Sequence, residues 1–303
     1  MSEKEIATVF KEFLNKNDMS PGLATICTLL KQLKTYKAST MAELSQNLKN
    51  TSKFILQNDD VLAAACISSS SELFQRHITL ESLKVLEVSN FEDVQSVLVA
   101  KGEKFLENVL AARKKILLYS FPFINEGVTI LTHSMSTNVE QVLNYAKSLN
   151  KSFKVFVTQS MPDESGSKMI EKLKQKNIFA TMILDSAVAY AMEQVDIVLL
   201  GAEGITANGG IINKIGCYQI CMAAKFLKKP VYIVSESIKF SKVFPLKQDD
   251  IPKVFRYKPS LEDTLSEHPR VDYTPPDLID VLITDLGVLT PSTVTEELMN
   301  LYL

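Results

Sequence analysis

From about residue 128 onward, short β-rich runs alternate with amphipathic helical runs. Strands are expected near 128–134, 153–160, 180–186, 196–203, 230–237 and 281–289, and helices over 138–150, 165–177, 187–195 and 213–229. A repeated strand, helix, strand order needs crossover connections, which make the strands parallel and place helices on both faces of the sheet. The strand runs are continuously apolar, as expected when both faces are buried. We therefore predict an α/β fold with a Rossmann-like, doubly wound, mostly parallel sheet.

The first 120 residues show a different pattern, with apolar residues at helical spacing and no strand-like alternation. Ser20 before Pro21 is typical of a helix start, and Thr40 with Glu43 has the sequence of a capping box. Further helical runs cover 71–86 and 94–117. The chain is therefore expected to form an all-helical N-terminal domain over 1–120 and a Rossmann-like α/β domain over 121–303.

Charge and cysteine content exclude several classes of protein. The formal net charge is -2, and the 33 basic residues form no cluster longer than residues 113–115, so direct nucleic-acid binding is not expected. The chain lacks an apolar run of membrane-spanning length and a signal peptide. The four cysteines have neither zinc-site spacing nor the density of a disulfide scaffold, and Cys217 and Cys221 are expected to be small buried side chains of one helix face. These features predict a reduced, soluble, intracellular protein without a metal or cofactor.

Polar residues follow almost every predicted strand. They are Thr132-His133-Ser134, Thr158-Gln159-Ser160, Asp185-Ser186, Gly201-Ala202-Glu203, Ser235-Glu236-Ser237 and Thr284-Asp285. Ligands of open α/β sheets bind outside the carboxyl ends of the strands, so these residues are candidates for a site. Helix N-caps also favour Ser and Asp there, which accounts for about half of them, but capping does not need the imidazole, the amide or the glutamates.

The stretch LLGAEGITANGGIINKIG, residues 199–216, predicts an anion-binding loop. Its Asn208-Gly209-Gly210 segment can turn through positive φ and expose backbone N–H groups, a helix from about Asn213 would add its positive end, and Lys214 a full charge. A phosphorylated small molecule is the expected guest, although the glycine spacing matches neither the Walker loop nor a dinucleotide fingerprint. A structural turn beside a solvated lysine is the alternative. A Ser-His hydrolase is disfavoured, because the side chains of adjacent His133 and Ser134 diverge on a strand.

The segments ILTHSMS, TQSMPDESGSKM, MILDSAVAY, DIVLLGAEGITANGGIINKIGCYQI, KKPVYIVSESIKF and VDYTPPDLIDVLITDLGVLTPSTVTEELMNLYL carry a family resemblance. Together they resemble the alpha subunits of eukaryotic translation initiation factor 2B, the guanine nucleotide exchange factor for initiation factor 2. The resemblance covers essentially the whole chain and is densest from residue 128. The same superfamily contains the methylthioribose-1-phosphate and ribose-1,5-bisphosphate isomerases.

The resemblance implies a regulatory subunit rather than an enzyme. The isomerases place a catalytic cysteine and a catalytic aspartate at the positions of Ser134 and Glu203. A hydroxyl is far less acidic than a thiol, and the extra methylene of Glu203 displaces its carboxylate, so no catalytic residue is predicted. An active sugar-phosphate aldose–ketose isomerase is the alternative. A retained sugar-phosphate or nucleotide-sugar site is predicted from His133, Ser134, Asp185, Glu203, Asn208, Gly209, Asn213 and Lys214.

The resemblance also implies partners. Alpha subunits homodimerise through the C-terminal domain and join beta, gamma, delta and epsilon subunits in one cytosolic complex. They help to bind initiation factor 2 that is phosphorylated on its alpha subunit, and the N-terminal helices are expected to make most of that contact. The apolar C-terminal helix, TVTEELMNLYL, is expected to dock either on its own subunit or on a neighbouring one, and the resemblance favours packing between subunits. A stand-alone metabolite sensor is a third reading, in which the dimer binds no other subunit.

Overall fold

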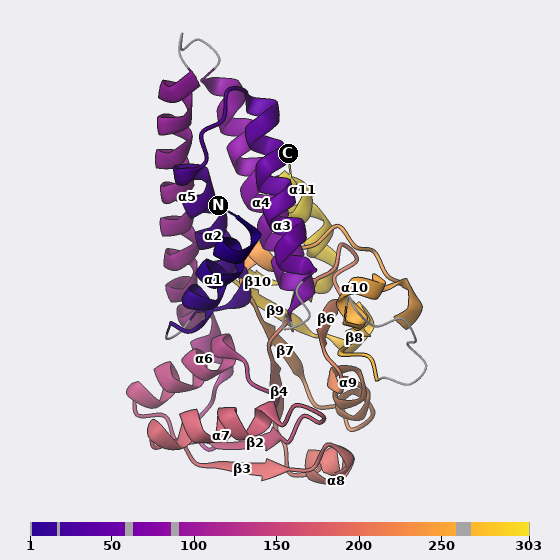
Figure 1. Cartoon of the computed structure of the whole chain (residues 1–303). Helices are drawn as coiled ribbons and strands as arrows, with labels where there is room; N and C mark the ends of the chain where they lie inside the picture. The colour runs from indigo at the N-terminus through magenta and orange to yellow at the C-terminus, as the bar shows by residue number, and fades with distance from the viewer. Residues whose placement is uncertain (1, 17–18, 58–62, 86–90, 259–267, 303) are drawn as a thin grey trace.

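The computed structural model describes residues 2–16, 19–57, 63–85, 91–258 and 268–302. Within these ranges the N-terminal region is helical throughout, as predicted from its periodicity. Its helices are α1 (Glu3–Leu14), α2 (Pro21–Thr35), α3 (Met41–Leu56), α4 (Ala64–Lys84) and α5 (Phe91–Ser120). The long helix α5 runs the length of this region and ends beside the sheet (Figure 1).

The predicted helix starts are confirmed at two caps. The Ser20 hydroxyl accepts a hydrogen bond from the Leu23 N–H at 3.3 Å, and Pro21 is the first residue of α2. The Thr40 hydroxyl accepts one from the Glu43 N–H at 3.2 Å. The Glu43 carboxylate bonds instead to the Ser39 N–H and the Tyr36 hydroxyl, so the box closes one residue earlier than expected. Helix α2 lies at the centre of the helical region, because most of its side chains are buried among α1, α3, α4 and α5.

The Rossmann-like fold is confirmed. The larger sheet has the strand order β10-β9-β7-β4-β1-β2-β3, and each neighbouring pair is parallel except β9 with β10. Its strands are β1 (Thr129–His133), β2 (Lys154–Thr158), β3 (Ala180–Ile183), β4 (Ile197–Leu200), β7 (Val231–Val234), β9 (Val281–Thr284) and β10 (Gly287–Leu289). The chain order reverses between β1 and β4, which creates the topological switch point where such sheets bind ligands.

Alternate residues of each strand pack on opposite faces of this sheet. Leu131, Val198 and Ile233 lie in one hydrophobic cluster with helices α8 (Val188–Met192), α9 (Cys217–Phe226) and α11 (Val294–Tyr302). Their neighbours Ile130, Leu199 and Val234 lie in another cluster with α6 (Thr137–Ser148) and α7 (Ser165–Gln175). Successive side chains of a strand point to opposite faces of the sheet, and both faces are buried here. A continuously apolar run is therefore needed in each strand.

A smaller antiparallel sheet was not predicted. It joins β5 (Gly204–Ile205), β6 (Ile211–Lys214) and β8 (Val271–Thr274) in the order β5-β6-β8. The expectation of a helix from Asn213 is therefore wrong: residues 213 and 214 belong to β6, and α9 begins at Cys217. The single strand expected over 281–289 is in fact the hairpin of β9 and β10. Pairing of β6 with a strand about sixty positions later is a long-range contact that local pattern does not carry.

The terminal helix α11 packs on its own chain. Val294 and Leu298 are buried in the core beneath the sheet, and Leu301 contacts both that core and the helical cluster. The expectation that this helix packs between subunits is wrong for these three side chains. The two parts of the chain also share a core, in which Ala64 and Ala65 of α4 contact the small sheet. No helix in the described ranges is long and apolar enough to cross a membrane.

Candidate functional site

A cavity of about 290 Å³ lies at the switch point of the sheet. Its walls come from the ends of β1 and β4, from β6 and the segment before α7, and from the starts of α2 and α4. They include Ser20, Cys66, His133, Ser134, Asn138, Asp163, Ser165, Lys168, Glu203, Asn213, Lys214 and Lys239. The cavity therefore opens between the sheet and the helical region. Of the predicted site residues, it brings together His133, Ser134, Glu203, Asn213 and Lys214.

One end of the cavity is a chain of hydroxyls that ends on an ion pair. The Ser134 Oγ lies 2.7 Å from the Ser165 Oγ, which donates to the Asp163 carboxylate at 2.9 Å. Lys214 donates to the same Ser165 Oγ at 3.1 Å and forms an ion pair with Asp163. Ser134 has φ 61°, a turn conformation that ends β1 and directs its hydroxyl into this cluster. Hydroxyl donors beside a lysine suit an oxyanion such as phosphate.

Glu203 also lines the cavity. Among the described residues its Oε2 has no hydrogen-bond partner, although it is shielded from solvent. Burial raises the pKa of this carboxyl to about 7, against the attraction of Lys214 and Lys239. The side chain is placed by the β5–β6 pairing, because the Glu203 N–H donates to the Ile212 carbonyl at 3.0 Å. Glu203 is thus a carboxyl that gains or loses its proton near neutral pH while facing a polar cavity.

Behind the cavity lies a buried ionic network centred on Glu236, which is 1% exposed. Its carboxylate accepts hydrogen bonds from Arg113 at 3.2 Å and Asn138 at 2.7 Å, and pairs with Lys239 at 3.2 Å. These charges lower the pKa of Glu236 to about 2, although burial alone would raise it. Arg113 also reaches the Ser20 hydroxyl at 3.3 Å. The network therefore joins α2, α5 and α6 to the sheet directly behind the cavity.

The His133 ring is fully engaged in the fold. Its Nδ1 lies 2.5 Å from the Thr158 Oγ1, and its Nε2 lies 2.9 Å from the Ile215 carbonyl oxygen. Because a carbonyl only accepts, Nε2 carries the proton and Nδ1 accepts from the threonine hydroxyl. Burial lowers the pKa of His133 to about 4, so the ring is neutral at physiological pH. His133 borders the cavity but has no ring nitrogen left for a ligand.

Asn208 and Gly209 lie outside the cavity, in the turn between β5 and β6. The Asn208 side chain donates to the Pro245 carbonyl at 2.8 Å and to the Tyr273 hydroxyl at 2.7 Å. The Gly209 N–H donates to Thr206, and the Gly210 N–H to the Asn208 side chain. The expectation that these N–H groups receive an anion is wrong, because the turn uses them internally. Gly209 has the predicted positive φ, at 83°, but its α-carbon faces Pro291.

Asp185 also lies apart from the switch-point cavity. It accepts hydrogen bonds from the backbone N–H groups of Ser160 at 3.0 Å and Met161 at 2.9 Å, and so fixes the segment after β2. It borders a different cavity, of about 540 Å³, formed by the α9 start, α10 (Lys253–Arg256) and β8. Asn213, in contrast, is inside the switch-point cavity and donates to the Gly201 carbonyl at 2.9 Å.

Sequence reasoning missed Asp163, Ser165, Lys239 and Cys66. Asp163 precedes α7 and Ser165 is its first residue, and polar residues at a helix start give no specific signal. Lys239 lies two residues beyond the strand-end run 235–237, and Cys66 comes from α4 of the helical region. Cys66 is the one thiol lining the cavity within the described residues, and burial raises its pKa, which disfavours the reactive thiolate. No group of three or more metal-ligating side chains occurs in the parts of the chain that the structure describes.

Comparison with known proteins identifies relatives along the whole chain. Residues 15–291 match the Initiation factor 2 subunit family. The chain is 37% identical to translation initiation factor eIF2B subunit alpha of Caenorhabditis elegans, with all of both chains covered. It is 37% identical to the subunit of the same name from Dictyostelium discoideum, over 98% of this chain and 96% of that one. The ribose 1,5-bisphosphate isomerase of Archaeoglobus fulgidus is 33% identical over 66% of each chain.

Solved structures of low identity share the fold. The tetrameric eIF2B-beta2-delta2 complex from C. thermophilum aligns with a TM-score of 0.75 at 19% identity, over 99% of this chain and 94% of that one. The Pyrococcus horikoshii translation initiation factor eIF-2B aligns with a TM-score of 0.72 at 20% identity, over 95% and 98% of the two chains. Their agreement extends to both the helical region and the sheet. On these matches, the chain belongs to the Initiation factor 2 subunit family.

Proposed function

We propose that this chain is a regulatory, non-catalytic subunit of alpha type in the translation initiation factor 2B exchange complex. The observation that carries the proposal is the 37% identity, over the full length of both chains, to a relative named eIF2B subunit alpha. In this role it acts in the cytosol, joins beta, gamma, delta and epsilon subunits, and mediates inhibition by phosphorylated initiation factor 2. The helical region, remote from the edge of the sheet at β3, is the part proposed to contact that phosphorylated factor.

The chemistry of the cavity supports a role without turnover. The hydroxyl of Ser134 hydrogen-bonds Ser165, and His133 is not available to it as a base, because both ring nitrogens are engaged by Thr158 and Ile215. The other acid that lines the cavity, Glu203, is partly protonated near pH 7. The cluster of hydroxyls, amide and lysines that remains is suited to binding a sugar phosphate. We propose that the cavity binds such a ligand without converting it.

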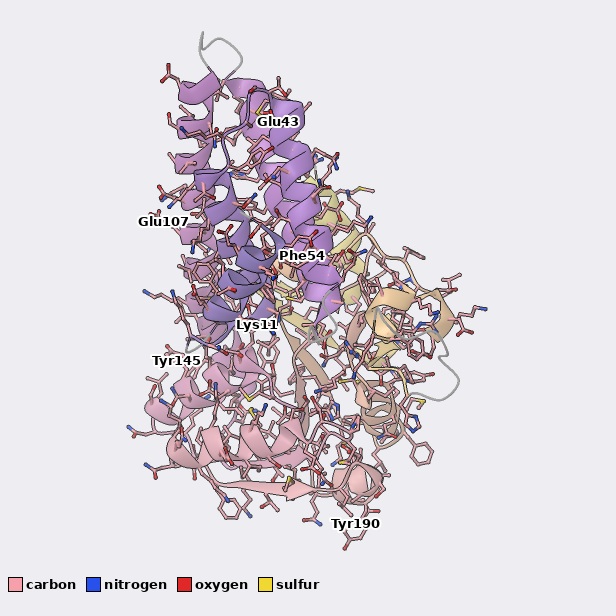
Figure 2. All side chains as sticks on the ribbon, viewed as in Figure 1. Lys11, Glu43, Phe54, Glu107, Tyr145 and Tyr190 are labelled. Atoms are coloured by element: carbon pink, nitrogen blue, oxygen red, sulfur yellow. The ribbon has the colours of Figure 1, made fainter. Side chains whose placement is uncertain are left out.

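Homodimerisation is proposed to use the outer side of α8 and α9. These helices pack side by side, and they expose Tyr190 at 77% and Phe226 at 86%. Met222, one turn before Phe226, is also exposed. Figure 2 shows Tyr190 at the end of the molecule farthest from the helical region, directed away from the ribbon. Large apolar side chains left exposed in this way typically mark a protein–protein contact.

The test is co-purification of the tagged chain from its own cells. We expect the beta and delta subunits to be recovered at stoichiometric levels. We also expect more initiation factor 2 to be recovered with the tagged chain when that factor is phosphorylated. Recovery of a homodimer alone, with no other subunit, would contradict the proposal and favour a stand-alone metabolite sensor.

The second candidate is an active sugar-phosphate isomerase, favoured by the 33% identity to a ribose 1,5-bisphosphate isomerase. It requires another group to replace the missing thiol, and Cys66 is the thiol that the cavity offers. Incubation of purified protein at high concentration with ribose 1,5-bisphosphate or methylthioribose 1-phosphate distinguishes the two. Turnover that disappears in Glu203→Ala would establish the isomerase, whereas we expect none.

A further inference from the structure

We infer that Asp163 is an internal competitor of the ligand: its carboxylate engages the cation and hydroxyl that would bind a phosphate, and a ligand phosphate binds by displacing it. The inference rests on the proposed sugar-phosphate binding and adds what sets the affinity of that site. Asp163, Ser165 and Lys214 all line the switch-point cavity. The hydrogen bonds of the Asp163 side chain carry the inference.

The Asp163 carboxylate accepts from the kinds of donor that an oxyanion uses. Its Oδ1 accepts from the Ser165 hydroxyl at 2.9 Å and from the Ser165 N–H at 3.3 Å. Its Oδ2 pairs with the Lys214 ammonium group. Ser165 is the first residue of α7, and an ammonium, a hydroxyl and an N–H at a helix start commonly bind phosphate together. One carboxylate of the protein already occupies this set of donors.

These donors form one connected cluster. The Lys214 ammonium group also donates to the Ser165 Oγ at 3.1 Å, and the Ser134 Oγ lies 2.7 Å from that same oxygen. A phosphate that accepted from Lys214 and Ser165 would therefore compete with Asp163 for both of them, and two anions at such short range repel each other. Burial raises the pKa of the Asp163 carboxyl, but Lys214 and Ser165 lower it below its ordinary value, so the competitor is ionised at neutral pH.

The ion pair of Asp163 is one that a ligand can exchange. The side chains of Asp163 and Lys214 are 29% and 17% exposed, so the displaced carboxylate can turn toward water. Lys239 lines the same cavity, but its partner Glu236 is only 1% exposed. Displacing Glu236 would leave a buried charge unpaired, which is strongly destabilising. Of these two lysines, Lys214 is therefore the one that can change its partner when a ligand anion enters.

A competitor and a supporting residue predict opposite effects. If Asp163 only positioned Lys214 for the ligand, removal of its charge would loosen the lysine and weaken binding. If Asp163 competes with the ligand, Asp163→Asn frees the ammonium group and strengthens binding. The asparagine amide oxygen still accepts hydrogen bonds from Ser165, so the local bonds at the start of α7 are kept.

The experiment measures binding of ribose 5-phosphate by calorimetry to the full chain, to Asp163→Asn and to Glu164→Gln, at about pH 7.5, where the phosphate is a dianion. We expect the affinity of Asp163→Asn to be about fivefold higher than that of the wild type, because the ligand no longer has to break a partly exposed ion pair. Glu164 is the exposed neighbouring acid and does not line the cavity. Glu164→Gln should change the affinity by less than about twofold.

The possible failures are distinct. If the wild type binds the probe and Asp163→Asn binds it equally or more weakly, the competitor role is wrong and the sugar-phosphate function stands. If neither protein binds it, the sugar-phosphate function is wrong and the competitor role with it. Thermal melting without ligand establishes that each variant is folded. Asp163→Ala, which also removes the charge, should give the same increase in affinity if asparagine disturbs the loop.

Discussion

At the scale of single residues, the charges of this protein are arranged as a buried structural network beside an open polar site. Glu236 belongs to the first and Glu203 to the second, although both follow strands of the same sheet. Both were predicted as polar strand ends, and Glu203 was also predicted as a residue of the sugar-phosphate site. Their environments separate them: cations hold the pKa of Glu236 at about 2, and burial without a hydrogen-bond partner raises that of Glu203 to about 7. The sequence shows two glutamates that each follow a strand, and the residues around them in the folded structure make their protonation behaviour different.

Glu236→Gln is expected to lower the free energy of unfolding by about 3–5 kcal/mol at pH 7, because it removes the buried anion that Arg113 and Lys239 share. The depressed pKa of Glu236 stabilises the fold fully above its unfolded value of 4.5, and this contribution of about 3 kcal/mol is lost as the pH falls toward 2. Urea denaturation from pH 7 downward should therefore show that the difference in free energy of unfolding between wild type and variant becomes smaller below about pH 5. A difference that stays constant with pH would contradict this assignment. The control is Glu107→Gln, which removes an exposed ion pair.

At the scale of elements, the β5–β6 turn illustrates how a motif that resembles a ligand loop can serve the fold. Gly209 does have a positive φ, as the glycine pair predicted. The turn, however, is covered by the segment before α11. Its Gly209 N–H donates to Thr206, and its Asn208 side chain donates to Pro245 and Tyr273. The site instead uses the far end of β6, where Asn213 and Lys214 face the cavity.

Gly209→Ala is expected to destabilise the protein by at least about 2 kcal/mol, since its φ is 83° and the new methyl group would overlap the Pro291 carbonyl. Gly127→Ala is the matched control, because its φ is 77° but nothing lies within 4 Å of the added atom. Only backbone strain remains there, which costs about 1 kcal/mol. Denaturant midpoints measure both. Equal losses at the two positions would show that the turn does not pack on the α11 segment as described.

At the scale of the whole molecule, the helical region and the sheet share a core and an ionic network, so the cavity between them depends on both. Tyr190 of α8 and Phe226 of α9 are among the most exposed large apolar side chains, and neither lines the cavity. That separation allows ligand binding and subunit contact to be tested independently.

The double variant Tyr190→Asp, Phe226→Asp is expected to be a monomer. In a two-fold dimer the new carboxylates of one subunit would be buried opposite those of the other subunit. Light scattering after size exclusion measures the mass. Leu110→Asp, on the exposed side of α5, should leave the dimer intact. Sugar-phosphate binding should be retained in all three proteins; a double variant that stays dimeric would remove α8 and α9 from the proposed interface.

The sequence by itself determined the helical first region and the strands of the parallel sheet, and it predicted a candidate site at the ends of those strands. These follow from periodicity and from runs of apolar residues, which act over a few positions along the chain. Tertiary structure alone decided that residues 213 and 214 form a strand, that α11 packs on its own chain, and that Asp163, Ser165 and Lys239 join Ser134 and Glu203 around one cavity. It also excluded Asn208, Gly209 and Asp185 from that cavity. Such outcomes depend on which distant segments pair and which polar atoms find partners, and neither is encoded in local pattern.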